Sequence, residues 1–191
     1  MKLIIGLGNP GAEYEGTRHN YGFVAVEYLA DCFKAKWKNK SKLSAEISEM
    51  LIDDEKVLLV KPTTFYNLSG DAVRALCDYY DLANENILVI HDDMTLLIGT
   101  LRMRIGGEAA GNNGIKNLID SVGEDFARLR IGSAVGQNSH GCTLPDRSLR
   151  DFVLSKPTKS ENETFKKLLP EIEKVVREFV RGNFTETSVS V

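Results

Sequence analysis

The hydrophobic and polar positions of this chain follow two different periods. Short apolar runs that end at glycine or acidic residues predict buried strands, and apolar residues spaced three and four apart predict helices with one buried face. Strands are expected at 2–7, 43–51, 56–60, 87–90, 101–105 and 126–131. Helices are expected at 23–33 and 71–80, at 113–122, and from Phe165 to Val180 as a C-terminal amphipathic helix.

This order of strands and helices predicts an α/β fold. Alternating strands and helices are typical of layered domains, and two pairs of consecutive strands favour a mixed twisted β-sheet flanked by helices over a purely parallel one. The acidic Asp53-Asp54-Glu55 segment predicts a hairpin between 43–51 and 56–60. With 191 residues, of which 42% are hydrophobic, the chain is expected to form a single globular domain over 1–191.

Two segments depart from this regular pattern. Pro170 lies inside the periodicity of the C-terminal helix, where it is expected to kink the helix or to mark its start. Residues 132–149 have no periodicity and are expected to form one long loop, a type of segment that is often functional.

The net charge of −3 at first argues against nucleic-acid binding, because phosphate recognition usually leaves a basic footprint. The charges are unevenly distributed, however. Residues 100–116 and 126–150 carry +2 and +3, whereas 71–93 carry −5. The five lysines of 34–42 are expected to lie on a solvated linker. The total charge therefore excludes a uniformly basic protein, not one that acts on RNA.

The three cysteines form no CxxC pair, and no apolar run approaches the roughly 20 residues of a membrane span. We therefore expect a reduced, cytoplasmic protein without membrane contact. Cys32 and Cys77 fall on apolar helix positions and are expected in the core. His140 and Cys142 have no further ligands nearby in sequence and make a poor metal site, so no metal is expected.

The segment GLGNPG at 6–11 satisfies the G-x-G-x-x-G fingerprint of dinucleotide-binding proteins. That fingerprint should open directly into a helix, with an acidic residue about 20 positions further on at the end of a second strand. Here an irregular polar stretch follows, and Glu27 and Asp31 fall on a predicted helix. A nucleotide-dependent enzyme is therefore disfavoured, and no cofactor is expected.

Three histidines are candidates for acid–base chemistry. His19 follows the glycine turn and lies near the carboxyl edge of the predicted sheet, where α/β proteins bind ligands; its imidazole can accept a proton from water at neutral pH. A structural histidine at a helix start is the alternative. His91 ends an apolar strand and is expected to pack. Asp92 emerges after that strand and can orient a histidine, although the same residue also suits an ordinary turn.

Asn9, Asn67 and Asn113 each lie in a glycine-rich turn. Their carboxamides offer two donors and an acceptor without charge, which suits an ester carbonyl, although asparagine is also common in turns. No G-x-S-x-G elbow is present, so activated water is favoured over a covalent intermediate.

The whole stretch GLGNPGAEYEGTRHNYG at 6–22 resembles the N-terminal signature of the bacterial peptidyl-tRNA hydrolase family. Further segments similar to that family follow in order. They are PTTFYNLSG at 62–70, HDD at 91–93, GGEAAGNNGIK at 106–116, RLRIG at 128–132 and FVLSKP at 152–157.

This resemblance implies a monomeric enzyme that hydrolyses the ester between a peptide and the 3′ end of tRNA, without metal or cofactor, and so recycles tRNA from aborted translation. By analogy, His19 is the general base and Asp92 stabilises its protonated form. Asn9 senses the acylated amine of the substrate. Asn67 and Asn113 bind the substrate backbone and the attacking water.

The resemblance also implies how the substrate is held. Tyr14 and Phe65 line the cleft for the tRNA end and the peptide. Arg104 and Arg130 grip phosphates of the acceptor arm. Lesser basic candidates are Arg102, Lys116 and, in the 132–149 loop, Arg147.

The chain departs from the family pattern at three places. Asn112 stands where the family usually has histidine, GEAAG at 107–111 replaces a glycine-rich run, and Ser133 to Gly136 replaces a different segment after RIG. A non-catalytic RNA-binding paralogue is the alternative function. It is disfavoured because His19, Asp92 and Asn9 are all present.

Overall fold

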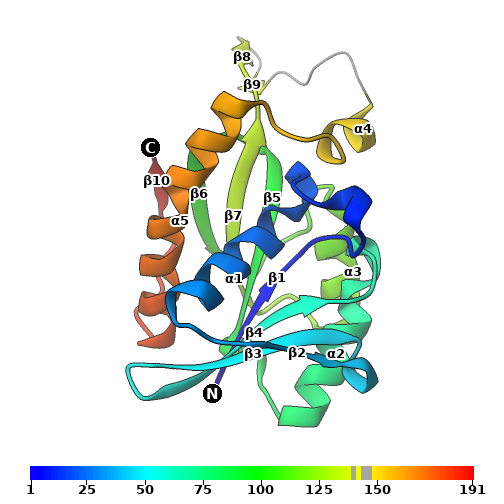
Figure 1. The fold of residues 1–191 in the computed structure, drawn as a ribbon, viewed down its shortest axis with the longest axis vertical. Helices are drawn as coiled ribbons and strands as arrows, with labels where there is room; N and C mark the ends of the chain where they lie inside the picture. Colours follow the sequence, from blue (N-terminus) through cyan, green and yellow to red (C-terminus); the bar gives the residue numbers. More distant parts are fainter. Residues whose placement is uncertain (139–140, 143–147) are drawn as a thin grey trace.

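The computed structural model describes residues 1–138, 141–142 and 148–191 and has an α/β fold around one eight-stranded mixed sheet (Figure 1). The strands of that sheet are β1 (Lys2–Gly6), β2 (Trp37–Lys40), β3 (Ala45–Ile52), β4 (Glu55–Pro62), β5 (Ile87–Leu97), β6 (Thr100–Ile105), β7 (Ala127–Ala134) and β10 (Ser188–Ser190). The α-helices are α1 (Tyr21–Cys32), α2 (Ser69–Tyr80), α3 (Asn113–Val122), α4 (Leu149–Val153) and α5 (Lys159–Val180). A separate two-stranded ribbon pairs β8 (Gln137–Asn138) with β9 (Gly141–Cys142).

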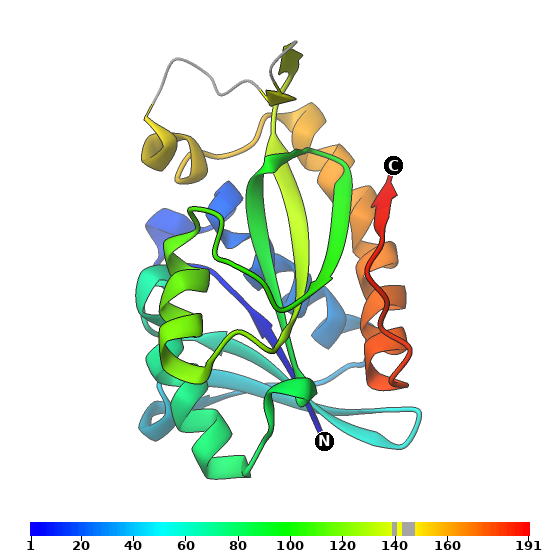
Figure 2. The ribbon, with the colours of Figure 1, turned by 180° about the vertical axis from the view of Figure 1, so that it is seen from behind.

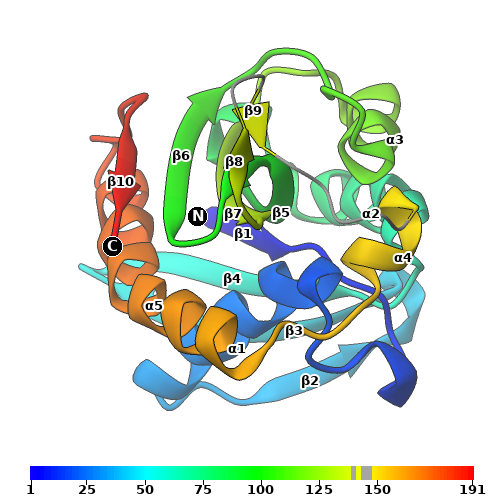
Figure 3. The same ribbon diagram turned by 90° about the horizontal axis from the view of Figure 1, so that it is seen from above.

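The sheet has the strand order β10-β6-β7-β5-β1-β4-β3-β2. β1 is parallel to both β4 and β5, and β5 is parallel to β7, whereas the outer pairs are antiparallel. This mixture confirms the prediction. The parallel strands end at the same edge of the sheet, which Figure 3 shows from above, and residues that follow β1 meet those of β5 there.

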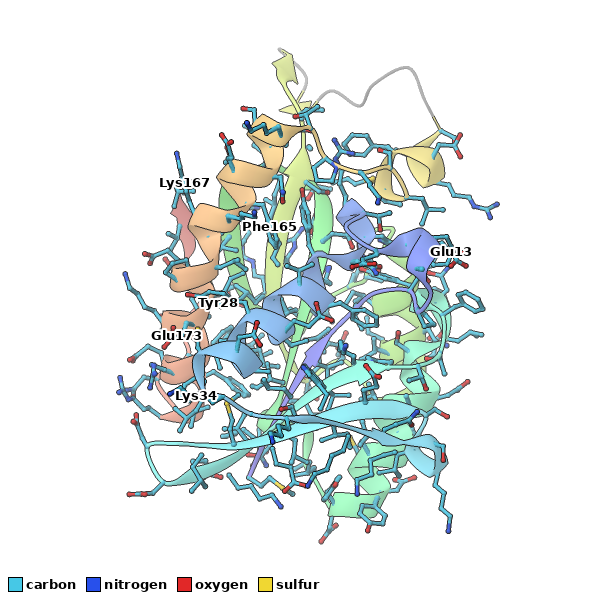
Figure 4. All side chains as sticks on the ribbon, in the orientation of Figure 1. Glu13, Tyr28, Lys34, Phe165, Lys167 and Glu173 are labelled. Atoms are coloured by element: carbon cyan, nitrogen blue, oxygen red, sulfur yellow. The ribbon has the colours of Figure 1, made fainter. Side chains whose placement is uncertain are left out.

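The core forms two layers, one on each side of the sheet. α1 and α5 cover one side and α2 and α3 the other (Figures 1 and 2). Ile4 packs toward the first side and its neighbours Leu3 and Ile5 toward the second, all fully buried, which is why β1 is a continuous apolar run. Phe165 points inward from α5, whereas Lys167 points away from it (Figure 4).

All six predicted strands and all four predicted helices are present, with shifted ends. The chain of 34–42, predicted to be a linker, instead contains β2, an edge strand paired to β3. Lys38 and Lys40 of β2 are exposed. Charged residues suit an edge strand, because they discourage pairing with a further strand. β10 and α4 were not predicted. None of the helices in the described part of the chain is long and apolar enough to cross a membrane.

In the C-terminal third, one of the two alternatives for Pro170 and the prediction for 132–149 were wrong. Pro170 does not mark a helix start, since α5 begins eleven residues earlier at Lys159, where Thr158 and Glu161 form a capping box. The first turns of α5 are mainly polar, so the apolar periodicity missed them. The segment 132–149 is not one loop either: β7 continues to the buried Ala134, β8 and β9 follow, and α4 begins at Leu149. His140 and Arg147 lie outside the described residues.

Candidate active site

A cleft of about 890 Å³ lies at the carboxyl edge of β1 and β5. Its walls come from the turn after β1, the turn before α2, the middle of β5, the start of α3 and α4. Seven of the nine predicted site residues line it: Asn9, Tyr14, His19, Phe65, Asn67, Asp92 and Asn113. Arg104 and Arg130 do not. Segments as far apart in sequence as Asn9 and Leu154 thus meet in one cavity.

His19 is positioned by the close packing of α1 on the sheet. It lies in a short 3-10 turn, Arg18–Asn20, just before α1 begins at Tyr21. Gly22 brings the helix against the strands: a Cβ atom there would lie 2.4 Å from the Ile90 carbonyl oxygen. On the other side of the turn, the buried Arg18 guanidinium forms a bidentate ion pair with Glu161 of α5. The backbone around His19 is therefore held from two directions.

His19 and Asp92 form a hydrogen-bonded pair. His19 Nδ1 lies 2.9 Å from Asp92 Oδ1 and 3.1 Å from Oδ2, and the carboxylate is 2% exposed. A carboxylate can only accept, so Nδ1 carries the proton of the neutral ring and Nε2 keeps a free lone pair. With 16% of its side chain exposed, His19 has access to the cleft. This geometry is typical of a general-base histidine that is oriented by a carboxylate.

Asp92 does not lie at a strand end as predicted. β5 continues through Asp92 and Asp93 to Leu97, because β7 pairs with it beyond the last residue of β1. The polar residues of this part of β5 face the cleft rather than a core, which is why an apolar pattern ends too early at Ile90. Asp92 therefore reaches the space above the end of β1 from a rigid neighbouring strand.

Tyr66 is a site residue that the sequence interpretation missed. Its ring stacks on the His19 imidazole, with centroids 3.5 Å apart and planes 13° apart, and its hydroxyl donates to Asp92 Oδ1 over 2.8 Å. Burial, and the nearby charge of Asp92, hold the pKa of the Tyr66 phenol well above its usual value, so it remains a neutral donor. The position between Phe65 and Asn67 in the matched motif was the available signal.

Asn9 is oriented by backbone hydrogen bonds. Its Oδ1 accepts from the Tyr66 backbone N–H over 2.8 Å, while Asn20 bonds both the backbone N–H and the carbonyl of Asn9. Because Oδ1 is engaged by a donor, Nδ2 is the end of the carboxamide that remains for a ligand. Asn9 therefore presents a hydrogen-bond donor at the cleft.

The remaining lining residues provide a mixed polar and apolar surface. Tyr14 and Phe65 pack edge to face, with centroids 6.3 Å apart, and Phe65 is 54% exposed. Asn67 and Asn113 are exposed and line the cleft together with Asn112, which caps α3. Aromatic faces beside free carboxamides suit a ligand with stacking and amide or ester groups.

The predicted basic residues lie beside the cleft. Arg102 and Arg104 of β6 pair in register with Arg130 and Arg128 of β7, whereas the alternate residues of these strands pack in the layer of α1 and α5. On the opposite side of the sheet, no helix lies over β6 and β7 in Figure 2. Arg130 is ion-paired with Asp93, which itself lines the cleft, and Arg104 with Glu186. Arg128 is buried and donates to the carbonyls of 107 and 108. These four arginines form what we call the arginine face.

Alternative chemistry finds little support among the described residues. No three His, Cys, Asp or Glu side chains cluster there as a metal site would require. Cys77 is buried as predicted, but Cys32 is exposed, because it lies at the very end of α1. The side chain of Cys142 is outside the described part. Lys116, a lesser basic candidate, pairs with Asp120 on α3.

Comparison with known proteins identifies a single family. The model of the peptidyl-tRNA hydrolase family matches residues 3–191. A peptidyl-tRNA hydrolase of Clostridium perfringens is 40% identical over 188 residues, which is 98% of this chain and 95% of that protein. One from Rickettsia typhi is 39% identical over 94% of this chain and 91% of its own length. The crystal structure of the peptidyl-tRNA hydrolase from Acinetobacter baumannii superposes with a TM-score of 0.86 at 34% identity, covering 95% of this chain and 89% of that one.

Proposed function

The chain belongs to the peptidyl-tRNA hydrolase family, and we propose that it hydrolyses the ester bond between peptide and tRNA through water activated by His19. The observation that carries the residue assignment is the His19–Asp92 pair, whose free Nε2 faces a cleft with carboxamides around it. The intact set of His19, Asp92 and Asn9 disfavours a non-catalytic RNA-binding paralogue.

The reaction starts with proton transfer from water to His19 Nε2 as the water oxygen bonds to the ester carbonyl carbon. Asp92 stabilises the imidazolium that forms. The negative charge that develops on the carbonyl oxygen is met by donors from Asn67 and Asn113. The ester bond then breaks, and the imidazolium returns its proton to the 3′ oxygen. The products are a free peptide carboxyl group and a tRNA with a free 3′ hydroxyl.

Asn9 distinguishes peptidyl-tRNA from aminoacyl-tRNA. Its Nδ2 group donates to the acyl carbonyl that a blocked amino group carries. An unblocked amino acid has no such carbonyl, and its ammonium is itself a donor that opposes Asn9 Nδ2. The pairing of Asn9 Oδ1 with the Tyr66 N–H keeps the carboxamide from flipping to accept such an ammonium.

The acceptor arm binds along the arginine face beside the cleft. Phosphates there replace the carboxylates of Asp93 and Glu186 as partners of Arg130 and Arg104. Tyr14 and Phe65 stack with the 3′ end of the tRNA or with the first residues of the peptide. One chain supplies the whole set of residues, which suits a monomer.

An N-acetylated aminoacyl-tRNA, its unblocked form and a His19→Ala variant test this function. The wild-type protein is expected to hydrolyse the blocked ester much faster than the unblocked one. His19→Ala is expected to lose on the order of 10²-fold or more in kcat while its Kd for tRNA stays the same. Asn9→Ala is expected to narrow the ratio of the two rates. Substantial turnover by His19→Ala would overturn the general-base assignment.

A further inference from the structure

Tyr66 contacts three residues of the proposed catalytic set, each with a different part of itself. Its backbone N–H orients Asn9, its ring stacks on His19, and its hydroxyl donates to Asp92. Tyr66 is thus in direct contact with Asn9, His19 and Asp92 at the same time. It is fully buried, so these contacts are not exchanged for contacts with water.

Asn112 and α3 hold Tyr66 in this position. Asn112 Nδ2 donates to the Tyr66 hydroxyl over 3.0 Å, while its Oδ1 accepts from the backbone N–H of Ile115 and so caps α3. α3 also approaches the ring closely: a Cβ atom at Gly114 would lie 2.4 Å from Tyr66 Cδ1 and Cε1. Because Asn112 supplies a donor, the phenol must give its own proton to Asp92, which sets the direction of the whole chain of hydrogen bonds.

We propose that Tyr66, held by Asn112, is a positioning residue that sets both the orientation of His19 and the strength with which Asp92 attracts the proton of His19. This inference rests on the proposed hydrolysis for its effect on rate, but not for its effect on the titration of His19. Tyr66 does not touch the reacting atoms. It acts through the stacked ring and through the shared carboxylate.

The sign of the effect follows from the hydrogen bond to Asp92. A phenol that donates to the carboxylate spreads part of its negative charge and weakens its pull on the proton of His19. Without that donor the carboxylate attracts the proton more strongly. His19 then stays protonated to a higher pH, and the free base that activates water is scarcer in the acidic range.

Other charged groups around the pair are mostly compensated. Asp93, the next residue on β5, is ion-paired with Arg130 of β7, and Arg18 is ion-paired with Glu161 of α5. His91 is buried, and burial lowers its pKa, so it contributes no charge near pH 7. Arg150 of α4 also lines the cleft, as an exposed cation. The hydrogen bond from the Tyr66 phenol to Asp92 therefore acts specifically on the His19–Asp92 pair.

The test compares Tyr66→Phe with Tyr21→Phe. Tyr21 is also buried and stacked, on Phe165 at 4.1 Å, but its hydroxyl has no hydrogen-bond partner among the described residues. Both variants lose one buried hydroxyl and keep the ring, so the comparison isolates the contact with Asp92. The chain has only three histidines, which makes the titration of the His19 imidazole accessible to NMR without substrate.

Tyr66→Phe is expected to move the titration of His19, and with it the acidic limb of kcat/KM, upward by roughly half a pH unit or more. Well above that limb, where His19 is deprotonated in both proteins, kcat is expected to remain about tenfold below wild type because the base is less well oriented, with KM nearly unchanged. Tyr21→Phe is expected to leave both unchanged.

Asn112→Ser provides a second variant that does not depend on the folding of Tyr66→Phe. Serine keeps the cap of α3 but cannot donate across to the phenol. A smaller shift in the same direction is expected. The double variant is expected to match Tyr66→Phe alone, because Asn112 acts through the phenol. Additive effects of the two substitutions would overturn this part of the proposal.

The outcomes separate the two proposals. An unshifted His19 titration and an unchanged kcat in Tyr66→Phe would overturn the positioning role, even if His19→Ala is inactive. Persistent hydrolysis by His19→Ala would overturn the proposed function, even if Tyr66→Phe shifts the titration.

Discussion

His91 is a buried histidine directly beside Asp92. Its Nδ1 lies 2.8 Å from the Asp92 carbonyl oxygen, which can only accept, so Nδ1 carries the proton. Its Nε2 has no partner among the described residues. Adding a second proton would therefore bury a charge and an unpartnered N–H. Burial lowers the pKa of His91 below its usual 6.5, outweighing the opposing charge of Asp93.

His91 is expected to lower the free energy of unfolding at acidic pH. As the pH decreases below about 6.5, the unfolded chain takes up a proton that the folded protein resists; above that pH both states are neutral and His91 contributes nothing. The free energy of unfolding is expected to lose up to about 1.4 kcal/mol per pH unit from this group. His91→Asn keeps a donor toward Asp92 but does not titrate. Urea unfolding at pH 7 and pH 5 is expected to show a smaller decline for it; equal declines would contradict this account.

At the scale of residues, the sequence indicated the polar residues that line the cleft, but not the residue that holds them in position. His19, Asp92 and the three asparagines belong to motifs with rare residue types at fixed spacing. The support from Tyr66 was missed, because its role depends on contacts with residues far away in sequence. Apart from its place in the matched motif, nothing in the sequence separates a tyrosine in the core from one stacked on the His19 ring.

At the scale of elements, the approach of α1 to the sheet decides where His19 lies. Gly22 of α1 has no room for a side chain: a Cβ atom would come within 2.5 Å of both the backbone nitrogen and the carbonyl oxygen of Leu7, as well as 2.4 Å from the Ile90 oxygen. These are backbone atoms, which cannot rotate away from an added methyl group as a side chain could. The helix itself would have to move.

Gly22→Ala is therefore expected to destabilise the fold by about 1–3 kcal/mol and to lower kcat, since His19 lies one turn before it. Asp31→Ala, on the exposed end of the same helix, serves as the control and should stay within about 0.5 kcal/mol of wild type. Urea unfolding and hydrolysis of a blocked aminoacyl-tRNA measure the two effects. Equal midpoints for Gly22→Ala and wild type would show that the helix tolerates the methyl group.

The periodicity of apolar residues predicted the elements that pack one face against the core. It failed for elements whose presence or ends depend on strand pairing or on a helix cap. β5 extends past Ile90 because β7 pairs with it, and the polar residues 91–93 interrupt the apolar run there. β2 is an edge strand of mostly exposed residues. α5 begins with polar turns that the Thr158 cap stabilises and continues past Pro170. In each case tertiary contacts outweigh the local pattern.

At the scale of the whole molecule, the net charge of −3 conceals the arginine face. Its accessible cations are not free, because the C-terminal segment lies against β6 and Glu186 pairs with Arg104 over 3.0 Å. The other oxygen of Glu186 accepts from the backbone N–H of Ile105. If an RNA phosphate binds Arg104 as proposed, it must therefore displace the Glu186 carboxylate.

Glu186→Gln keeps an acceptor for the Ile105 N–H but removes the negative charge. We expect it to lower the Kd for tRNA about two- to fivefold and to steepen the dependence of binding on salt. Glu178→Gln, in a similar exposed pair between Glu178 of α5 and Arg181 just after it, is the matched control and should change neither. Arg104→Ala is expected to act in the opposite direction. Salt titrations of binding measure all three, and an unchanged slope for Glu186→Gln would place the tRNA path elsewhere.

The strand order also determines how late in its own synthesis this chain can bring His19 and Asp92 together. His19 follows the first strand and Asp92 lies 73 residues later, yet they meet because β5 inserts directly beside β1. Until residue 92 has left the ribosome, His19 lacks the carboxylate of Asp92. Among the described strands, the part of β5 that carries Asp92 pairs with β7, which is made later still. The nascent chain is itself a peptide esterified to tRNA. The topology thus delays the formation of the His19–Asp92 pair, the centre proposed to cleave such esters, until most of that chain has been made.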